Sequence, residues 1–335
     1  MKRMLNQFVD RVLARIHFRS RRHSSRTVKL ILAGQSLKYL DIGAAGGEQS
    51  RWKHYSDSID YVLVEPDERS RYELYELFGP STLIVDKALW SETGSTQMNL
   101  CSDPKQSSVY KPNMDLLSKY QLSERYTINS NMIVECSTID ELLSEFNFSL
   151  DFIKLDIQGA ELKVLSGGQQ SLPSVLGVEV EVEFSSQYID QPLADEVFLF
   201  MRNNGFEFLD FVHINRWERT AYSGLGQAMF ADAVFIQSPD ITVRQVSKGM
   251  IPLNKAMKLI AILYIYRRYD LALHMLHSLL FLELIDNKLG KQIETHISRK
   301  RNKLKRIQKI ILFANRLLDE NSRKEPSFPS IHLQI

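Results

Sequence analysis

Short apolar runs alternate with amphipathic stretches through the middle of the chain. The runs predict strands, and the stretches, which carry apolar residues three and four positions apart, predict helices. The expected strands cover residues 38–42, 61–65, 83–85, 152–156, 178–184, 206–212 and 233–236. The expected helices cover 67–78, 139–146, 159–167 and 194–203. This alternation favours an α/β fold, in which a mostly parallel sheet has helices on both faces. Because no helix separates the last two strands, we expect them to form an antiparallel hairpin at the sheet edge.

Helical patterns dominate both ends of the chain. Residues 4–18 have apolar positions at helical spacing, and a basic linker follows over 19–26. The C-terminal part predicts two or three antiparallel helices over 254–270, 271–287 and 290–318, before a loose tail over 322–335. We therefore expect a basic N-terminal helix and linker over 1–30, an α/β domain over 31–245 and a helical, basic C-terminal extension over 246–335.

Charge is distributed unevenly along the chain, although the net charge is only +2. Residues 1–30 carry a net +8, residues 31–247 a net −16 and residues 248–335 a net +10. An acidic middle between two basic ends indicates that these parts of the chain have different functions.

Composition excludes several classes of protein. Two cysteines, Cys101 and Cys136, cannot make a disulfide framework or a four-thiolate zinc site. The basic N-terminus lacks the apolar core and cleavage site of a signal peptide. The most apolar run, residues 259–266, is too short to span a bilayer. These features favour a cytoplasmic protein.

The sharpest local motif follows the first predicted strand. Asp41 precedes a glycine-rich turn that contains Gly43, Ala44 and Gly46. Glycine allows a sharp bend and a close approach of the backbone to a ligand. The spacing is not the Gly-x-Gly-x-x-Gly of pyrophosphate-binding sites, and an acid at this point suits a cationic group. S-adenosylmethionine carries such an amino group, so the motif predicts that cofactor, with Asp41 facing the amino group.

Acidic residues also end the second and third predicted strands. Glu65 can accept hydrogen bonds from both ribose hydroxyls of a nucleoside, and Pro66 starts the helix that follows it. Asp86 is placed to reach the adenine amine, although an isolated acid at a strand end is equally often a helix cap.

The sequence over residues 37–236 resembles the FkbM family of methyltransferases. The shared motifs are the turn at Asp41, Glu65-Pro66, Lys87-Ala88-Leu89, Ser107-Ser-Val109, Ser137-Thr-Ile-Asp140, Phe152-Ile-Lys-Leu-Asp-Ile-Gln-Gly-Ala-Glu161, Val164-Leu-Ser-Gly167, Glu179-Val-Glu-Val-Glu-Phe184, Gly205-Phe206 and Ala231-Asp-Ala-Val-Phe235. The chain departs from the family at Gln158, where members often have Glu. The basic N-terminal arm and the helical C-terminus lie outside the resemblance.

This resemblance implies a Rossmann-like fold and S-adenosylmethionine-dependent methyl transfer. Family members mostly methylate hydroxyls, many of them on sugars or natural products, and often in cell-surface polysaccharide pathways. The resemblance therefore implies an O-methyltransferase with a saccharide or glycolipid-precursor acceptor, and adds Lys87 to the candidate cofactor residues. Two alternatives stay open: an NAD(P)-dependent oxidoreductase on a similar fold, and a non-catalytic module that kept the fold.

Candidate catalytic residues lie at the ends of the fourth and fifth predicted strands. Lys154 and Asp156 share one side of their strand, so Lys154 can be the ion-pair partner of Asp156. An alcohol is a poor nucleophile until it loses its proton, and Asp156 is the first candidate base, with His213 the second. Glu181 is expected near the acceptor hydroxyl. A divalent metal held by Asp156, Glu181 and His213 is possible but not favoured, because no tight ligand spacing is present. The same side chains could instead form a structural ion-pair network.

The C-terminal extension contains a dense basic run over residues 298–306 on a predicted helix. An anionic membrane surface or glycolipid would complement this charge; the alternative is a solvated helix face packed against the acidic α/β domain. The run has no aromatic residues on which bases could stack, so nucleic acid is not favoured.

Overall fold

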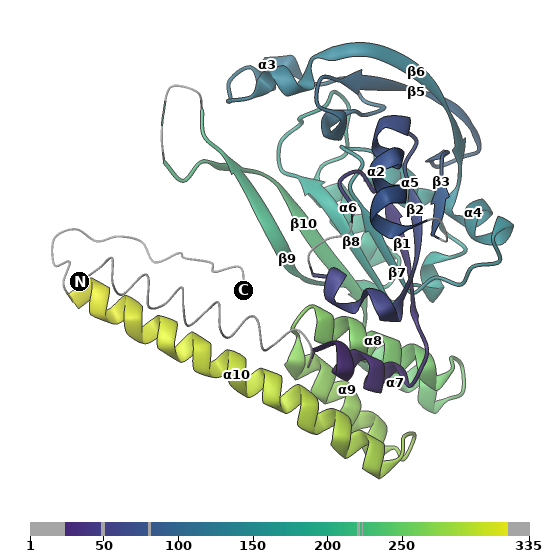
Figure 1. Cartoon of the computed structure of the whole chain (residues 1–335), viewed down its shortest axis with the longest axis vertical. Helices are drawn as coiled ribbons and strands as arrows, with labels where there is room; N and C mark the ends of the chain where they lie inside the picture. Colours follow the sequence, from purple (N-terminus) through teal and green to yellow (C-terminus); the bar gives the residue numbers. More distant parts are fainter. Residues whose placement is uncertain (1–23, 48–50, 80–81, 220–221, 223, 321–335) are drawn as a thin grey trace. The chain divides into compact units, whose positions relative to one another are not determined.

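The chain divides into two compact units in the computed structural model (Figure 1), which describes residues 24–47, 51–79, 82–219, 222 and 224–320. One unit is Ser36–Ser238, and the other combines Met1–Gln35 with Pro239–Ile335. The helix expected over 4–18 and the tail expected over 322–335 lie outside the described residues. The division into three parts at 30 and 245 stays a prediction.

A seven-stranded sheet forms the centre of the first unit. Its order is β3-β2-β1-β7-β8-β10-β9, and the first five strands are parallel. The last two are antiparallel to their neighbours, as the hairpin prediction required. The strands are β1 (Leu37–Ile42), β2 (Ile59–Val64), β3 (Leu83–Val85), β7 (Phe152–Leu155), β8 (Gly177–Glu183), β9 (Phe206–Trp217) and β10 (Gln227–Gln237). The expected Rossmann-like α/β fold is confirmed.

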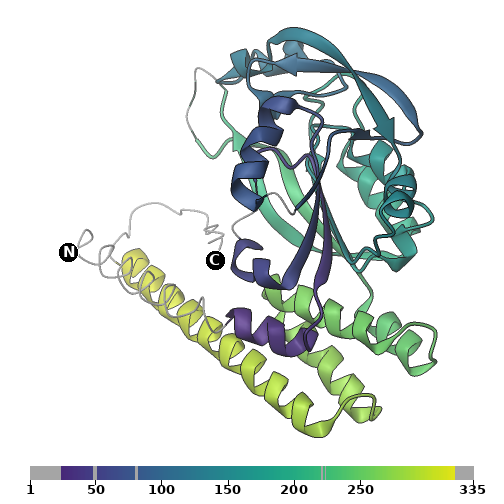
Figure 2. The ribbon, with the colours of Figure 1, turned by 45° about the vertical axis from the view of Figure 1, so that its right-hand side comes forward.

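Helices cover both faces of this sheet, as Figure 2 shows. One face carries α2 (Glu68–Phe78), and the other carries α4 (Ile139–Glu145), α5 (Glu161–Ser166) and α6 (Ala194–Asn203). The face under α4, α5 and α6 is aliphatic and fully buried; its members include Leu40, Ile42, Val62, Val64, Ile153, Leu155, Val178, Val180 and Val182. Burial on this scale makes it the main core of the unit.

The opposite face of the sheet changes character along the strands. Near their amino ends the buried rings of Tyr39, Trp52 and Phe152 pack together, with centroids 4.8–5.5 Å apart. Near their carboxyl ends the same face carries charged residues on neighbouring strands, among them Asp41 and Lys154, which are register partners. Ligands of open α/β sheets bind at the carboxyl ends of strands, so the charged half of this face is where a site is expected.

A small second sheet was not predicted. It consists of β4 (Ala88–Leu89), β5 (Gly94–Cys101) and β6 (Ile128–Ser137), in the order β4-β6-β5. The missed pair, β5 and β6, is rich in Ser, Thr, Asn and Gln and largely exposed, so it lacks the apolar alternation that marks a strand. A short helix, α3 (Met114–Leu117), and 3-10 helices over Lys53–Ser58, Pro104–Gln106, Ser123–Tyr126 and Leu172–Ser174 complete the unit.

The second unit is helical in its described part. It contains a helix over residues 24–32, α7 (Pro239–Ser247), α8 (Leu253–Ile265), α9 (Tyr269–Phe281) and α10 (Asn287–Glu320). Ten of the thirteen residues of α8 are buried, which explains the most apolar run of the sequence as a core helix. Helix α7 was not predicted. Within the described residues, no helix combines the length and the apolar character that crossing a bilayer requires.

Candidate functional site

The turn after β1 requires glycine for two reasons. Gly43 has a φ of +78° and Gly46 a φ of +89°, values that other residues rarely adopt. A Cβ on Gly43 would also lie 2.1 Å from the backbone oxygen of Asp156. The backbone N–H groups of Gly43 and Ala44 donate to the oxygen of Val64 at 3.0 and 3.3 Å. The turn is thereby fixed against the ends of both β2 and β7.

Glu65 lies at the carboxyl end of β2 and is buried. Its Oε1 accepts a hydrogen bond from the backbone N–H of Asp67 at 2.9 Å. Asp67 in turn caps α2, because its Oδ1 accepts from the N–H of Arg69 at 2.9 Å. Burial raises the pKa of Glu65 to about 7, against the opposing effect of its backbone hydrogen bond. The helix start therefore holds this carboxylate in one orientation.

A narrow cavity of about 90 Å³ joins Glu65 to the end of β7. Its wall combines the glycine turn, the end of β2, strand β4, the loop after β5 and the end of β7 with single residues of β5 and β6. Its lining residues include Gly43, Ala45, Glu65, Pro66, Leu89, Trp90, Lys105, Ser107, Ser108, Asp156, Ile157 and Gln158. The second sheet, which sequence reasoning missed, thus supplies one side of this cavity.

The predicted cofactor residues divide into two groups. Gly43, Glu65 and Pro66 line the cavity. The others do not line it: Asp41, Ala44, Gly46, Asp86 and Lys87. Ala44 is buried and Asp86 is exposed, and a Cβ on Gly46 would lie 3.2 Å from Nζ of Lys105. Contacts of these residues with a cofactor stay predictions.

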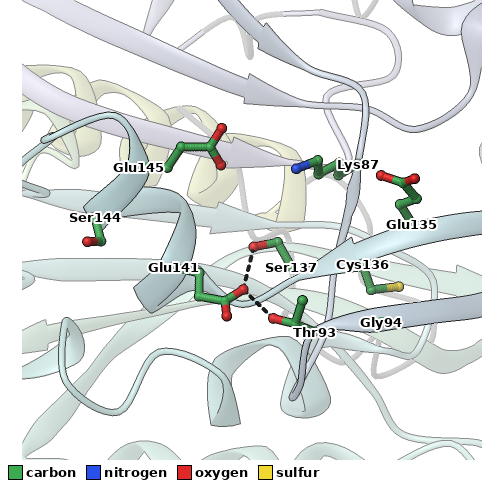
Figure 3. Close-up of a pocket in the computed structure, with 9 residues that line it drawn as sticks. All are labelled: Lys87, Thr93, Gly94, Glu135, Cys136, Ser137, Glu141, Ser144 and Glu145. Atoms are coloured by element: carbon green, nitrogen blue, oxygen red, sulfur yellow. Dashed lines mark hydrogen bonds between the residues drawn. The ribbon is translucent and has the colours of Figure 1, made fainter.

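Lys87 lies instead at a separate surface hollow of about 440 Å³, shown in Figure 3. There it shares the lining with Glu135, Glu141 and Glu145. Glu141 accepts hydrogen bonds from the hydroxyls of Ser137, at 3.0 Å, and Thr93. The carboxylate of Glu141 is therefore already engaged within the hollow.

A buried chain of charges crosses from β1 to the end of β7. Nζ of Lys154 lies 3.3 Å from Oδ1 of Asp41 and 3.6 Å from Oδ2 of Asp156. It also donates to the backbone oxygen of Gly43 at 3.3 Å. The predicted ion pair of Lys154 with Asp156 is confirmed. Burial raises the pKa of Asp41 to about 6, although Lys154 opposes the shift. Burial alone would lower the pKa of Lys154, but the carboxylates of Asp41 and Asp156 outweigh this effect and raise it.

Gln158 connects the charged face to the cavity wall. Its Nε2 donates to Oδ1 of Asp156 at 3.2 Å and to Oε1 of Glu181 at 3.1 Å. Its Oε1 accepts from the hydroxyl of Tyr188 at 2.9 Å, and its backbone oxygen accepts from Ser108 at 2.7 Å. The backbone of Gln158 has a φ of +60°, a conformation that costs a non-glycine residue about 1–2 kcal/mol. Sequence reasoning gave neither Gln158 nor Tyr188 a role.

Asp156 differs from the other carboxylates of this region in its exposure. Its side chain is 39% exposed, whereas Glu161, Glu181 and Glu183 are buried. Burial raises the pKa of Glu161 to about 7 and the pKa values of Glu181 and Glu183 well above the usual range, and neighbouring carboxylates add to the shifts. Asp156 is therefore the carboxylate of this group that an incoming molecule can reach.

His213 lies further along the same row of strands. It is the register partner of Asp232 on β10, and Asp232 is the register partner of Glu181 on β8. Burial first, and the carboxylates of Glu179 and Asp156 next, raise the pKa of Asp232 to about 7. Strand β10, which carries Asp232, therefore lies between the strands of His213 and Glu181. Sequence reasoning gave Asp232 no role.

Two of the glutamates on β8 have side-chain partners. Arg51 donates to Oε2 of Glu179 at 2.9 Å, and Gln158 donates to Glu181.

In the part of the chain that the structure describes, no group of three or more His, Cys, Asp or Glu side chains is arranged to hold a metal ion.

Comparison with solved structures finds methyltransferases at low similarity. Solved structures with a similar fold include a 1,6-didemethyltoxoflavin-N1-methyltransferase of Burkholderia thailandensis with bound S-adenosylhomocysteine, which is 11% identical (TM-score 0.30; 70% of this chain and 86% of that chain covered). They also include a TehB-like methyltransferase of Corynebacterium glutamicum, 12% identical (TM-score 0.30; 70% and 100% covered). A methyltransferase of Agrobacterium tumefaciens is 10% identical (TM-score 0.32; 65% and 61% covered). Likenesses this distant carry no argument about activity, and no curated protein matches the chain significantly.

The family comparison is the informative one. The family model described as "Methyltransferase FkbM domain" matches residues 41–208, half of the chain. The matched region runs from the acid before the glycine turn through the second sheet and the strands that carry Asp156 and Glu181 into β9. The chain belongs to the FkbM family of S-adenosylmethionine-dependent methyltransferases.

Proposed function

We propose that the protein is an O-methyltransferase that methylates a hydroxyl of a saccharide or a glycolipid precursor. The observation that carries the proposal is the exposed carboxylate of Asp156, which lies at the cavity wall beside Gly43 and pairs with Lys154 at 3.6 Å. A hydroxyl needs a base to become a good nucleophile, whereas a neutral amine does not. The saccharide part of the proposal follows from the family resemblance.

The residues around the cavity fit S-adenosylmethionine. Gly43 leaves the space that a Cβ would fill, and Glu65 presents a fixed carboxylate of the kind that accepts from ribose hydroxyls. Leu89 and Trp90 supply apolar surface for a purine ring. We expect Gly43, Glu65 and Pro66 to hold the nucleoside, and the loop over 104–108 to move outward, because ligand sites usually enclose about 300–1,000 Å³.

The chain's own residues then supply alignment and proton transfer. When bound, S-adenosylmethionine supplies a methyl group that is already activated by its sulfonium sulfur. Asp156 would take the proton of the acceptor hydroxyl as that oxygen receives the methyl group. Lys154 offsets the charge of Asp156 before this step, and Gln158 holds its Oδ1 in place. Proximity and alignment account for most of the rate gain in such a displacement.

A transfer assay with methyl-labelled S-adenosylmethionine and a panel of saccharides and lipid-linked saccharides tests the proposal. We expect label in a methyl ether, identified by mass spectrometry and NMR. Asp156→Asn should lower transfer at least about 100-fold, the usual contribution of a general base, while affinity for S-adenosylhomocysteine changes less than about twofold. Asp115→Asn, an exposed aspartate of α3, is the matched control and should retain activity.

Four outcomes would contradict the proposal. Label in a methylated nitrogen or carboxylate would exclude O-methylation. Full activity of Asp156→Asn would exclude this base. Tight binding of NAD(P) without binding of S-adenosylhomocysteine would favour the oxidoreductase alternative. Cofactor binding without transfer to any saccharide would favour the non-catalytic module.

A further inference from the structure

A basic groove of about 920 Å³ lies in the helical unit, between the helix over 24–32 and α10. Arg26 lies on one wall, and Lys288, Lys291 and Arg299 lie on the other. No carboxylate is among the residues that line it. A concave surface with one sign of charge concentrates the electrostatic field and attracts anions.

The two walls are held together by paired side chains. Oγ1 of Thr27 lies 3.1 Å from Nδ1 of His296, and Nζ of Lys300 donates to Oγ of Ser24 at 2.6 Å. Since the residue numbers on one helix rise as those on the other fall, the helices are antiparallel. Lys288, Lys291 and Arg299 therefore form a stripe along α10, about 16 Å long at 1.5 Å per residue. That length exceeds the size of a single phosphate group.

Few acidic residues accompany this stripe in the sequence. Residues 287–309 contain nine Lys and Arg and one acid, Glu294, which hydrogen-bonds to His277 at 3.1 Å. Residues 1–23 carry seven Lys and Arg and one Asp, and residues 321–335 carry two basic residues and one Glu. Neither end of the chain therefore supplies a net negative charge. Burial, with Lys303 and Arg267 nearby, lowers the pKa of Lys300 to about 8, as expected where positive charges crowd.

Apolar residues accompany the basic stripe at both ends. Phe281, at the end of α9 and shortly before α10, is 86% exposed, and Leu282 after it is also exposed. Further along α10 the sequence places Leu304, Ile307 and Ile311 at helical spacing. Basic helices with flanking apolar residues are typical of segments that lie in the interface of an anionic membrane.

We propose that the groove and the basic stripe of α10 bind the headgroups of anionic phospholipids at a membrane surface. The stripe supplies the cations for several phosphates, and Phe281 supplies an apolar side chain that can enter the headgroup layer. No Phe, Tyr or Trp is among the residues that line the groove, which disfavours base stacking and therefore nucleic acid as the occupant. The proposal is independent of the methyl acceptor and of Asp156.

Vesicle co-sedimentation of the full chain tests this proposal. We expect binding to phosphatidylcholine vesicles that contain phosphatidylglycerol, weaker binding as salt rises, and no binding to phosphatidylcholine alone. Inorganic phosphate at the same phosphate concentration should compete poorly, because a vesicle presents many headgroups at once. Equal competition by inorganic phosphate would assign the groove to a free anion and overturn the proposal.

A pair of charge-matched variants locates the contact. Lys288→Gln/Lys291→Gln should lower vesicle affinity roughly 20-fold, because each basic residue near an anionic surface contributes about fivefold. Arg244→Gln/Lys248→Gln removes the same charge from exposed positions at α7 and should have little effect. Equal losses in both variants would show a general charge effect and overturn the site. Tighter binding to an oligonucleotide than to anionic vesicles, with the same sensitivity to Lys288 and Lys291, would replace the membrane by nucleic acid.

Discussion

Gln158 donates a hydrogen bond from Nε2 to Oε1 of Glu181 at 3.1 Å, and this contact joins the exposed end of β7 to the buried strand β8. The same nitrogen reaches Asp156, so one neutral amide separates two carboxylates. A glutamate at 158 would place a third carboxyl group between them.

Gln158→Glu should destabilise the fold in a pH-dependent way. The hydrogen bond donated to Asp156 becomes a like-charge contact and the one donated to Glu181 is lost, so we expect the free energy of unfolding to fall by about 1–3 kcal/mol at mildly alkaline pH. Glu161 and Asp232 have pKa values raised to about 7 in the folded protein. The pKa of each of these acids is higher in the folded protein than in the unfolded chain. Each therefore contributes stability that is complete below its pKa in the unfolded chain, near 4, and is lost as pH rises through its pKa in the folded protein, near 7.

Urea unfolding at acidic and alkaline pH measures this effect. The loss caused by Gln158→Glu should shrink toward pH 5, where neighbouring carboxyl groups take up protons. Gln169→Glu, the same change at an exposed position, should behave like the wild type throughout. A loss of equal size at both pH values would mean that charge repulsion is not the cause.

Glu65→Gln should weaken the binding of S-adenosylhomocysteine at least about tenfold, since a hydrogen bond to a charged group contributes about 1.5–3 kcal/mol. Because the pKa of Glu65 is raised to about 7, acidification protonates it and makes it a poorer acceptor. The wild-type dissociation constant should therefore rise as pH falls below 7, and the variant should lose this dependence. Calorimetric titration measures both effects. Glu68→Gln, on exposed α2 surface, is the control; a pH dependence retained by Glu65→Gln would assign it to another group.

Gly43→Ala should abolish cofactor binding, because the new Cβ would meet the oxygen of Asp156 at 2.1 Å. Gly205→Ala provides the comparison: Gly205 also has a positive φ, +82°, but nothing lies within 4 Å of its Cβ position. In Gly205→Ala the free energy of unfolding should fall by only about 1–2 kcal/mol, the conformational cost of a Cβ at positive φ, and the affinity for the cofactor should not change. Thermal unfolding and calorimetry separate the two effects. Equal behaviour of the variants would show that the close approach to Asp156 is unimportant.

Asp41→Asn should destabilise the protein by about 3–5 kcal/mol, because it removes the nearest partner of the buried ammonium of Lys154. The double variant Asp41→Asn/Lys154→Met should recover part of that loss. Urea unfolding of the two variants tests the structural role. Unchanged stability together with lost cofactor affinity would instead support the contact with the cofactor amino group that the sequence suggested.

The strand–helix alternation was sufficient to predict the large sheet. β3 and α6 were predicted with the bounds that the structure has, and the antiparallel pair β9 and β10 followed from a missing helix. Strands β5 and β6 could not be found this way, because their exposed polar residues do not alternate with apolar ones. Burial on one face leaves a trace in sequence, whereas pairing at an exposed surface leaves little.

The site was predictable in its residue types but less so in its pairings. Gly43 and Glu65 lie where the motif suggested, because the strand order brings both turns to one edge. The engagement of Asp41 by Lys154 depends on the register of β1 against β7, which no local pattern encodes. The contact of Tyr188 with Gln158 joins residues thirty positions apart through a loop, and sequence spacing alone does not indicate such a contact.

The absence of a side chain at Gly43 has one more consequence. With only hydrogen there, the backbone of Asp156 can fit directly against the glycine turn. The residue that closes against the turn is thus the same residue that we propose as the base, so a side chain added at 43 would displace both parts of the site together.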